Sequence, residues 1–260
     1  MFYNQGNRMN FNKYKFAELN FSVFKISDKA SDFVSNLSSN DINDSQTAFL
    51  DINGKIIATA FQKIIDGDVF LVVAREYAGD LEAHFQKYLR ISTTRVEKIE
   101  SRVFLFVHET TDEYDINKME NGIAIPGGTI KWFSTGPYPD PEYKMKESEF
   151  TLFRIRNMLP FQGVDYEHNM LLELNQPLMV SFTKGCYLGQ EIIARVSSRG
   201  IPPRTIKRLV FADKPELLSA GGKEAGKITS IAYSEKEKAW LVFAMVDKNI
   251  EEIDGVSFYL

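Results

Sequence analysis

Apolar residues in the first half of the chain recur in short alternating runs separated by turn residues. Alternation with a period of two predicts half-buried strands, whereas spacings of three and four predict amphipathic helices. Asn53-Gly54 and Asp66-Gly67 separate three of these runs, and such dipeptides favour tight hairpins, the first of type I′. The pattern predicts helices at Ala30–Leu37 and Glu76–Leu89, and strands at Thr47–Leu50, Lys55–Ile64, Val69–Ala74, Thr94–Ile99 and Arg102–His108.

Glycine and proline divide the second half into shorter units. Gly127–Glu142 predicts an irregular connection before a helix that begins near Glu147, and Gly200–Arg204 predicts a second joint. The segments expected between and after these joints are a strand at Pro177–Phe182, a turn at Thr183–Gly189, a helix at Gln190–Val196, and strands at Ile206–Ala212, Gly226–Tyr233 and Ala239–Val246.

These elements predict an α+β fold dominated by antiparallel pairing rather than a parallel, doubly wound sheet. We expect one domain over residues 1–200, with an inserted subdomain at roughly 45–110, and a small C-terminal β-barrel over residues 201–260. A body of about 60 residues buries too little surface to be stable alone. The barrel is therefore expected to pack on the larger part through an apolar interface.

Charge and hydropathy narrow the range of partners. Lysine and arginine total 31 against 35 acidic residues, and a net charge of −4 disfavours nucleic-acid binding. The longest apolar runs are far shorter than the ~20 residues of a membrane span. The first twenty residues lack the apolar stretch of a secretory signal, so we expect a cytoplasmic protein, with Met9 an alternative to Met1 as the native start.

Cysteine and histidine usage bears on metal chemistry. Cys186 is the single cysteine, which excludes an intramolecular disulfide. The three histidines, His84, His108 and His168, are scattered and never four residues apart. We therefore expect no metal site, and no iron–sulfur cluster held by one chain.

Cys186 lies in a turn framed by Gly185 and Gly189, and glycine is favoured where a backbone bends sharply or approaches a ligand. Lys184 and the start of the following helix both favour the thiolate over the thiol. Free cysteine is also among the most buried residue types, so a packing role for Cys186 stays open.

The helix after this turn carries Glu191 and Arg195 four residues apart, on one face. Their charges could serve a ligand. The alternative is a solvated ion pair, which typically contributes about 0–1 kcal/mol to stability.

The segment Lys184–Glu191 resembles the signature lysine-glycine-cysteine-aromatic-x-glycine-glutamine-glutamate of YgfZ-type proteins, folate-binding relatives of the glycine-cleavage T-protein. Weaker resemblance extends over most of the chain, from Phe33–Asp41 through Phe49–Ala58 to Gly226–Ser230. Flanking residues that agree in order and spacing are Arg156, Pro160, Gly163, Asp165, Glu173, Arg195, Arg199 and Gly200. The resemblance implies a T-protein-like fold, in which two antiparallel α+β folate-binding subdomains and a C-terminal barrel surround a central hole.

The resemblance also implies tetrahydrofolate, or another reduced folate, as the cofactor. A folate needs a carboxylate for its pterin edge, an apolar wall and basic groups for its anionic tail. Glu173 is the candidate for the pterin edge and Tyr187 for the wall, although Glu173 could be an ordinary helix-end carboxylate and Tyr187 a core residue. The candidates for charge near the tail or the turn are Lys184, Arg195 and Arg199, and the signature residues Gln190 and Glu191 complete the candidate folate-binding set.

Two functions follow from the resemblance. The first is an accessory protein that uses folate and the Cys186 thiol to support assembly or repair of [4Fe–4S] enzymes, with client or assembly proteins as partners. The second is a folate-dependent aminomethyltransferase, for which Asp80 is only a loose match to the aspartate that positions the reactive carbon. A module that only binds a protein partner is a third alternative, and whether any reaction is catalysed stays open.

Overall fold

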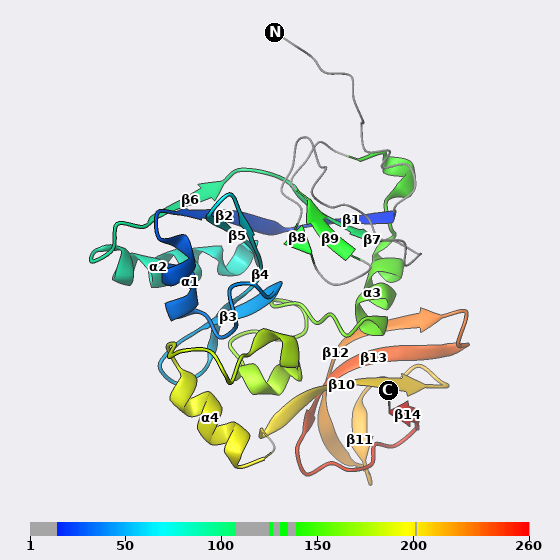
Figure 1. The fold of residues 1–260 in the computed structure, drawn as a ribbon. Coiled ribbons are helices and arrows are strands. Elements are labelled where there is room, and N and C mark those ends of the chain that lie inside the picture. Colours follow the sequence, from blue (N-terminus) through cyan, green and yellow to red (C-terminus); the bar gives the residue numbers. More distant parts are fainter. Residues whose placement is uncertain (1–14, 108–124, 127–130, 135–138, 201, 260) are drawn as a thin grey trace.

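The computed structural model describes residues 15–107, 125–126, 131–134, 139–200 and 202–259 (Figure 1). Met1, Met9, His108 and much of the expected connection Gly127–Glu142 lie outside these residues. The described strands form three sheets, and every pairing between these strands is antiparallel. This arrangement agrees with the α+β class expected from the sequence.

The first sheet has the strand order β3-β4-β5-β2-β6. Its strands are β2 (Phe21–Ser27), β3 (Gln46–Leu50), β4 (Ile56–Ile65), β5 (Asp68–Ala74) and β6 (Arg95–Ile99). Helix α1 (Ala30–Leu37) contacts β5, and α2 (Ala78–Leu89), preceded by the 3₁₀ turn η2 (Arg75–Tyr77), contacts β4. Six consecutive residues of β5, from Val69, are buried, as expected for a central strand covered on both faces.

Phenylalanine rings join the helices to this sheet. The Phe85 ring of α2 lies 5.5 Å from Phe33 of α1 and 5.1 Å from Phe49 of β3, both in edge-to-face geometry. Such pairs add about 0.5–1.5 kcal/mol beyond the burial of their area. Phe85 is fully buried and connects the three elements.

The second sheet has the order β1-β7-β9-β8, and the third has the order β11-β12-β13-β10-β14. Helix α3 (Glu147–Arg156) packs on β12 and β13 of the third sheet, and α4 (Gln190–Ser198) contacts the 3₁₀ helix η5 (Leu171–Leu174). The strands are β1 (Lys15–Leu19), β7 (Val103–Val107), β8 (Ile125–Pro126) and β9 (Lys131–Ser134) in the second sheet, and β10 (Arg204–Phe211), β11 (Leu218–Ala220), β12 (Lys223–Ser234), β13 (Ala239–Asp247) and β14 (Val256–Tyr259) in the third.

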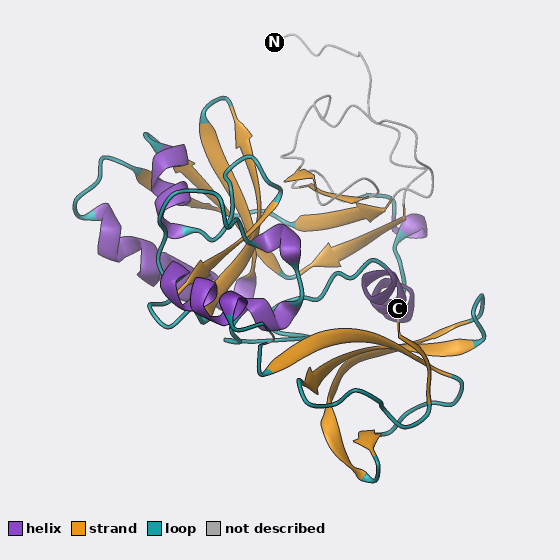
Figure 2. Ribbon diagram, turned by 60° about the horizontal axis from the view of Figure 1, so that its bottom comes forward, coloured by secondary structure: helices purple, strands orange, loops and turns teal. Residues whose placement is uncertain are grey.

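The C-terminal sheet is curved but open, because β11 and β14 are its edges and the described residues contain no pairing between them (Figure 2). The small β-barrel expected from the sequence is thus an open half-barrel. One apolar cluster joins this sheet to the rest of the chain. It contains Ile155, Tyr166 and Leu171 from the larger part together with Phe243 and Met245 from β13.

Three local expectations were wrong, and the first is the irregular connection over Gly127–Glu142, whose described part includes strand β9 paired with β7. The chain between β3 and β4 is a five-residue loop, 51–55, in which Gly54 has a positive φ and Asn53 does not, so it is no type I′ turn. The Asp51 carboxylate shapes this loop by accepting from the backbone N–H groups of Asn53 and Lys55, both at 2.8–2.9 Å. The expected strand at Pro177–Phe182 instead begins with the 3₁₀ helix η6 (Pro177–Met179).

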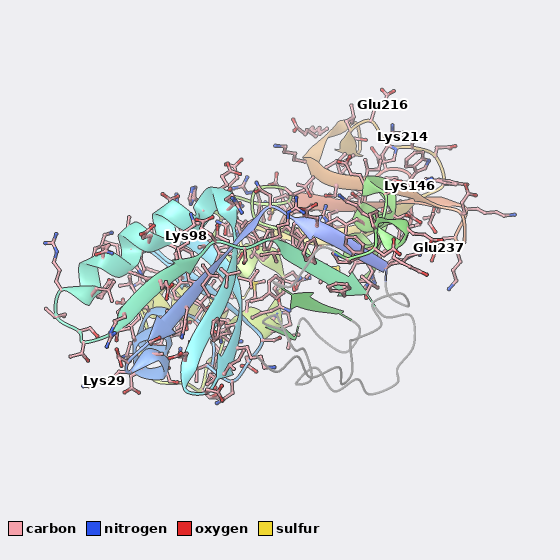
Figure 3. All side chains as sticks on the ribbon, turned by 90° about the horizontal axis from the view of Figure 1, so that it is seen from above. Lys29, Lys98, Lys146, Lys214, Glu216 and Glu237 are labelled. Carbon is pink, nitrogen blue, oxygen red and sulfur yellow. The ribbon has the colours of Figure 1, made fainter. Side chains whose placement is uncertain are left out.

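Charged residues lie at the surface of both the N-terminal and the C-terminal parts of the molecule. Figure 3 shows Lys29 and Lys98 on the N-terminal part, and Lys214, Glu216 and Glu237 on the C-terminal part, and all five are exposed. In the part of the chain that the structure describes, no helix is long and apolar enough to span a bilayer.

Candidate functional site

The turn that carries Cys186 is fixed at its C-terminal end by Gly189, the N-cap of α4. Gly189 has φ +83°, and a Cβ atom built there would lie 2.7 Å from the Asp51 carbonyl oxygen. Any other residue would therefore be strained in its own backbone and would collide with the 51–55 loop. Glycine is required here by close backbone approach, as the spacing of the signature suggested.

Lys184 fixes the turn at its N-terminal end. Its Nζ donates to the carbonyl oxygens of Ser35, Ser38 and Asn40 at 2.7, 2.8 and 2.8 Å. Desolvation on burial lowers the pKa of Lys184 to about 8, and the Asp41 carboxylate opposes this shift. All three N–H groups of the ammonium have protein acceptors, so Lys184 has no donor left for a folate tail in this arrangement.

Cys186 and Tyr187 face opposite environments. The Cys186 thiol is exposed, which speaks against a packing role. Tyr187 is buried in the apolar cluster shared with the C-terminal sheet, and burial raises the pKa of its phenol to about 12. Its hydroxyl oxygen has no hydrogen-bond partner among the described residues, and its ring lies 5.3 Å from Lys184 Nζ.

The candidate residues of α4 lie at the surface. Arg195 pairs with Glu191 at 2.7 Å, and their side chains are 51% and 83% exposed. Arg199 is also exposed, and Gln190 is half-buried. This geometry matches the solvated pair that the sequence left as an alternative, and such pairs stabilise a protein by about 0–1 kcal/mol.

Glu173 lies apart from the turn, in η5, and is buried. Its Oε2 accepts a hydrogen bond of 2.8 Å from Asn169 Nδ2, and its Oε1 is 3.8 Å from Nε of the half-exposed Arg204. Asn169 and Arg204 line a cavity of about 390 Å³ between the 163–169 segment and the C-terminal sheet. The remaining lining residues are Gly163, Val164, Asp165, Tyr166, Glu167, Lys227, Ile228, Thr229 and Met245.

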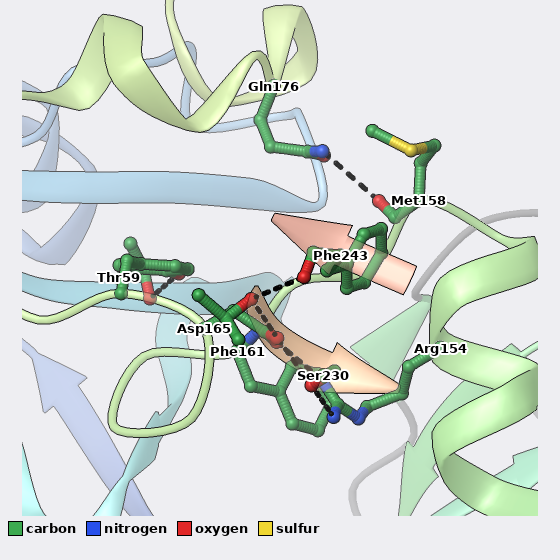
Figure 4. A network of polar contacts seen from close by, with 10 residues as sticks. Thr59, Arg154, Met158, Phe161, Asp165, Gln176, Ser230 and Phe243 are labelled. Carbon is green, nitrogen blue, oxygen red and sulfur yellow. Dashed lines mark hydrogen bonds and ion pairs between the residues drawn. The ribbon is translucent and has the colours of Figure 1, made fainter. Parts of the chain in front are cut away.

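A buried polar network holds the two walls of this cavity together (Figure 4). Arg154 of α3 donates to Asp165 at 2.5 Å and to the Ser230 hydroxyl at 2.9 Å. Asp165 also accepts from Ser230 at 2.6 Å, from Thr229 at 3.1 Å and from the backbone N–H of Phe161 at 2.8 Å. The Arg154 and Asp165 side chains are 4% and 0% exposed, so the pair is fully desolvated.

Tyr166 separates the cavity from a smaller inner pocket, because it lines both. Its hydroxyl is 2.9 Å from Thr59 Oγ1, and burial raises the pKa of the phenol. The inner pocket has apolar walls from Phe21, Phe61 and Phe161, and a free volume of about 10 Å³. That volume suits one water molecule. A flat ring could enter it only after side chains move.

The predicted site residues therefore fall into two groups. None of the eight candidates lines the 390 Å³ cavity, but Glu173 contacts two of its lining residues, Asn169 and Arg204. The two groups are neighbours, because α4 packs on η5. Sequence reasoning missed Asn169, Tyr166 and Arg204 as lining residues, since no periodic pattern or motif marks them.

Comparison with known proteins bears on the fold. No model of a known protein family matches the chain. Its structure is similar to the crystal structure of the glycine cleavage system aminomethyltransferase T from Bartonella henselae, with a TM-score of 0.72 and 12% sequence identity, over 90% of this chain and 78% of that one. The chain thus has the fold of that aminomethyltransferase. An identity of 12% shows the fold alone.

Proposed function

We propose that this protein is a cytoplasmic, YgfZ-type protein that binds tetrahydrofolate or another reduced folate and supports the assembly or repair of [4Fe–4S] enzymes. In this proposal the folate occupies the 390 Å³ cavity, and Cys186 acts on a client or assembly protein at the surface. The proposal keeps the domain division expected from the sequence, with a folate-binding domain over residues 1–200 that contains an insertion near 45–110, and a C-terminal domain over residues 201–260.

The observation that carries the proposal is the buried carboxylate of Glu173 beside a cavity in a fold shared with an aminomethyltransferase. Small-molecule sites usually enclose about 300–1,000 Å³ and combine apolar walls with a few fixed polar groups. A pterin presents an amino group and a ring N–H on one edge, which a carboxylate can accept together. Arg204 and Lys227 line the same cavity and offer cations to the anionic tail.

The Glu173 carboxylate can accept hydrogen bonds from a ligand in a defined direction, because its orientation is already fixed. Asn169 Nδ2 donates to Oε2, whereas Oε1 lies 3.8 Å from Arg204 Nε and accepts no hydrogen bond from the residues that the structure describes. In this proposal the half-exposed Arg204 side chain moves aside, so that a ligand in the cavity reaches the Glu173 carboxylate behind it. Lys184 anchors the thiol-bearing turn in this proposal, and Tyr187 supports the turn from the core.

We expect the Glu173→Gln variant to bind tetrahydrofolate at least tenfold more weakly than the wild type. The substitution replaces a charged acceptor by an amide whose NH₂ opposes the donor edge of the pterin, and hydrogen bonds to charged groups contribute about 1.5–3 kcal/mol. Isothermal titration calorimetry measures the affinity. The matched control is Glu235→Gln, an exposed glutamate of the β12–β13 turn that should bind as the wild type does. Absence of binding to the wild type would remove the folate proposal altogether.

We expect Cys186→Ala to restore [4Fe–4S] enzyme activity poorly in a strain that lacks this protein, although it should bind folate with unchanged affinity. The thiol is exposed and lines no part of the cavity, so its loss affects the client step alone. Enzyme activity in cell extracts, normalised to client protein, measures the rescue. Full rescue by the variant would contradict a role for the thiol.

The second candidate function is folate-dependent aminomethyl transfer, which the likeness to the Bartonella henselae aminomethyltransferase favours. A transferase would convert an aminomethylated lipoyl carrier and tetrahydrofolate into methylene-tetrahydrofolate, ammonia and the dihydrolipoyl carrier, whereas an accessory protein would bind folate without turnover. Incubation of the protein with the aminomethylated lipoyl carrier and tetrahydrofolate distinguishes the two functions, because only a transferase would form methylene-tetrahydrofolate.

A further inference from the structure

The contacts of Lys184 differ from those of an ordinary surface lysine. Its three acceptors are main-chain carbonyl oxygens from the last turn of α1 and the residues just after it, at Ser35, Ser38 and Asn40. Carbonyl groups at the C-terminal end of a helix lack intrahelical partners and carry partial negative charge. The Lys184 side chain therefore ties the start of the thiol-bearing turn to the C-terminal end of α1.

The geometry is specific for the protonated amine. An ammonium has three N–H donors, one for each carbonyl oxygen in the site. A neutral amine has two donors and a lone pair, and the lone pair would face a carbonyl oxygen at about the same distance. Loss of the proton therefore removes one hydrogen bond, weakens the other two and introduces a repulsive contact.

We propose that Lys184 is the positioning residue for Cys186: its ammonium anchors the 183–189 turn to α1, and loss of the proton loosens the turn and frees the thiol to move. The assignment deepens the proposed function, on which the importance of the thiol rests. The test of this assignment needs neither folate nor a client protein. The role of Lys184 and the proposed function can therefore fail separately.

Cys186 is well placed to respond to this anchor. The turn is held near its start by the Lys184 side chain and by the Lys184 backbone N–H, which donates to Ser181 Oγ, and at its end by Gly189 against the Asp51 carbonyl. Cys186 lies between them and is exposed, whereas Tyr187 is held in the core. Release of the Lys184 side chain therefore removes the anchor on the N-terminal side of the thiol, while Tyr187 and α4 stay in place.

The groups that face the ammonium set the pH range. Desolvation lowers the Lys184 pKa to about 8, the Asp41 carboxylate favours the charged form, and Tyr187, whose pKa is raised to about 12, stays neutral. Because the anchored form is the protonated one, the turn is held below about pH 8 and loosened above it.

A spin label on Cys186 tests the proposal, since the chain has no other cysteine and the label removes thiol ionisation from the readout. Electron paramagnetic resonance should show label mobility rising by about twofold or more as the pH increases from about 6.5 to about 9.5. The Lys184→Met variant should be mobile at every pH. Lys184→Arg, whose guanidinium stays charged, should show no transition in this range.

The control is Lys236→Met, an exposed lysine of the β12–β13 turn, which should keep the wild-type pH profile. Circular dichroism at each pH checks that the label does not report unfolding. A constant spectrum in the wild type, or a pH transition of the same size in Lys184→Arg, would overturn the proposal. The pH profiles of the wild type and of Lys184→Arg still test the proposal if Lys184→Met does not fold.

Discussion

The Arg154→Met variant should lose about 3–5 kcal/mol of unfolding free energy, because it leaves the Asp165 carboxylate buried without its cation. Asp165 is fully buried and keeps its contacts with Ser230, Thr229 and the Phe161 backbone, but neutral donors do not replace a guanidinium. Methionine fills a similar volume, so little of the loss comes from a cavity. Urea denaturation followed by fluorescence measures the change.

Two comparisons isolate the cause. Arg195→Met removes the exposed ion pair of α4 and should cost less than about 1 kcal/mol. The double variant Arg154→Met/Asp165→Asn should recover part of the lost stability, since it removes the unpaired charge and keeps an acceptor for the Phe161 N–H. If Arg154→Met were no more damaging than Arg195→Met, the buried pair would not be the link described here.

The Phe85→Ala variant should also lose about 3–5 kcal/mol, because it opens a cavity at a fully buried position. Both ring contacts of Phe85, to Phe33 and Phe49, are lost, so α1, α2 and β3 lose their common neighbour. In a protein of this size each kcal/mol lowers the melting temperature by about 2–4 °C. Differential scanning calorimetry should therefore record a decrease of roughly 6–20 °C.

Phe182→Ala is the matched control, since that ring is 56% exposed and its loss should change stability by less than about 0.5 kcal/mol. Phe85→Leu keeps most of the volume and should be affected less than Phe85→Ala. Equal melting temperatures for Phe85→Ala and Phe182→Ala would show that the ring cluster does not hold the helices on the sheet.

Elements flanked by strong local signals were predictable from the sequence. Asp66-Gly67 forms the expected two-residue hairpin between β4 and β5, with positive φ at both residues, and the helices at Ala30–Leu37 and near Leu81 also occur. Elements that depend on distant partners were missed. β2 pairs with β5 some fifty residues later, as Phe21 opposite Ala74 shows, and no turn signal marks its start.

Local signals also failed where other contacts outweighed them. Asn53-Gly54 favours a type I′ turn, but the Asp51 carboxylate caps a wider loop, and that loop supports Gly189. The apolar run after Pro177 resembles a strand, yet Leu178 and Phe182 are exposed, so the segment does not alternate toward a core.

The candidate site was only partly predictable for a related reason. The signature located the turn and the thiol, but the acceptors of Lys184 are backbone oxygens, which no side-chain pattern reveals. The Arg154–Asp165–Ser230 network joins residues up to 76 positions apart. Its members are ordinary polar residues in the sequence and become a unit only when α3 and β12 pack together.

One apolar cluster contains Ile155 and Leu171 of the larger part and Phe243 and Met245 of the C-terminal sheet, so the two parts share a continuous core. Cleavage of the chain near residue 200 would expose apolar surface on both fragments. We therefore expect neither fragment to fold stably on its own. The C-terminal segment therefore depends on the rest of the chain for its stability, and its transfer to another protein would carry over only part of a fold.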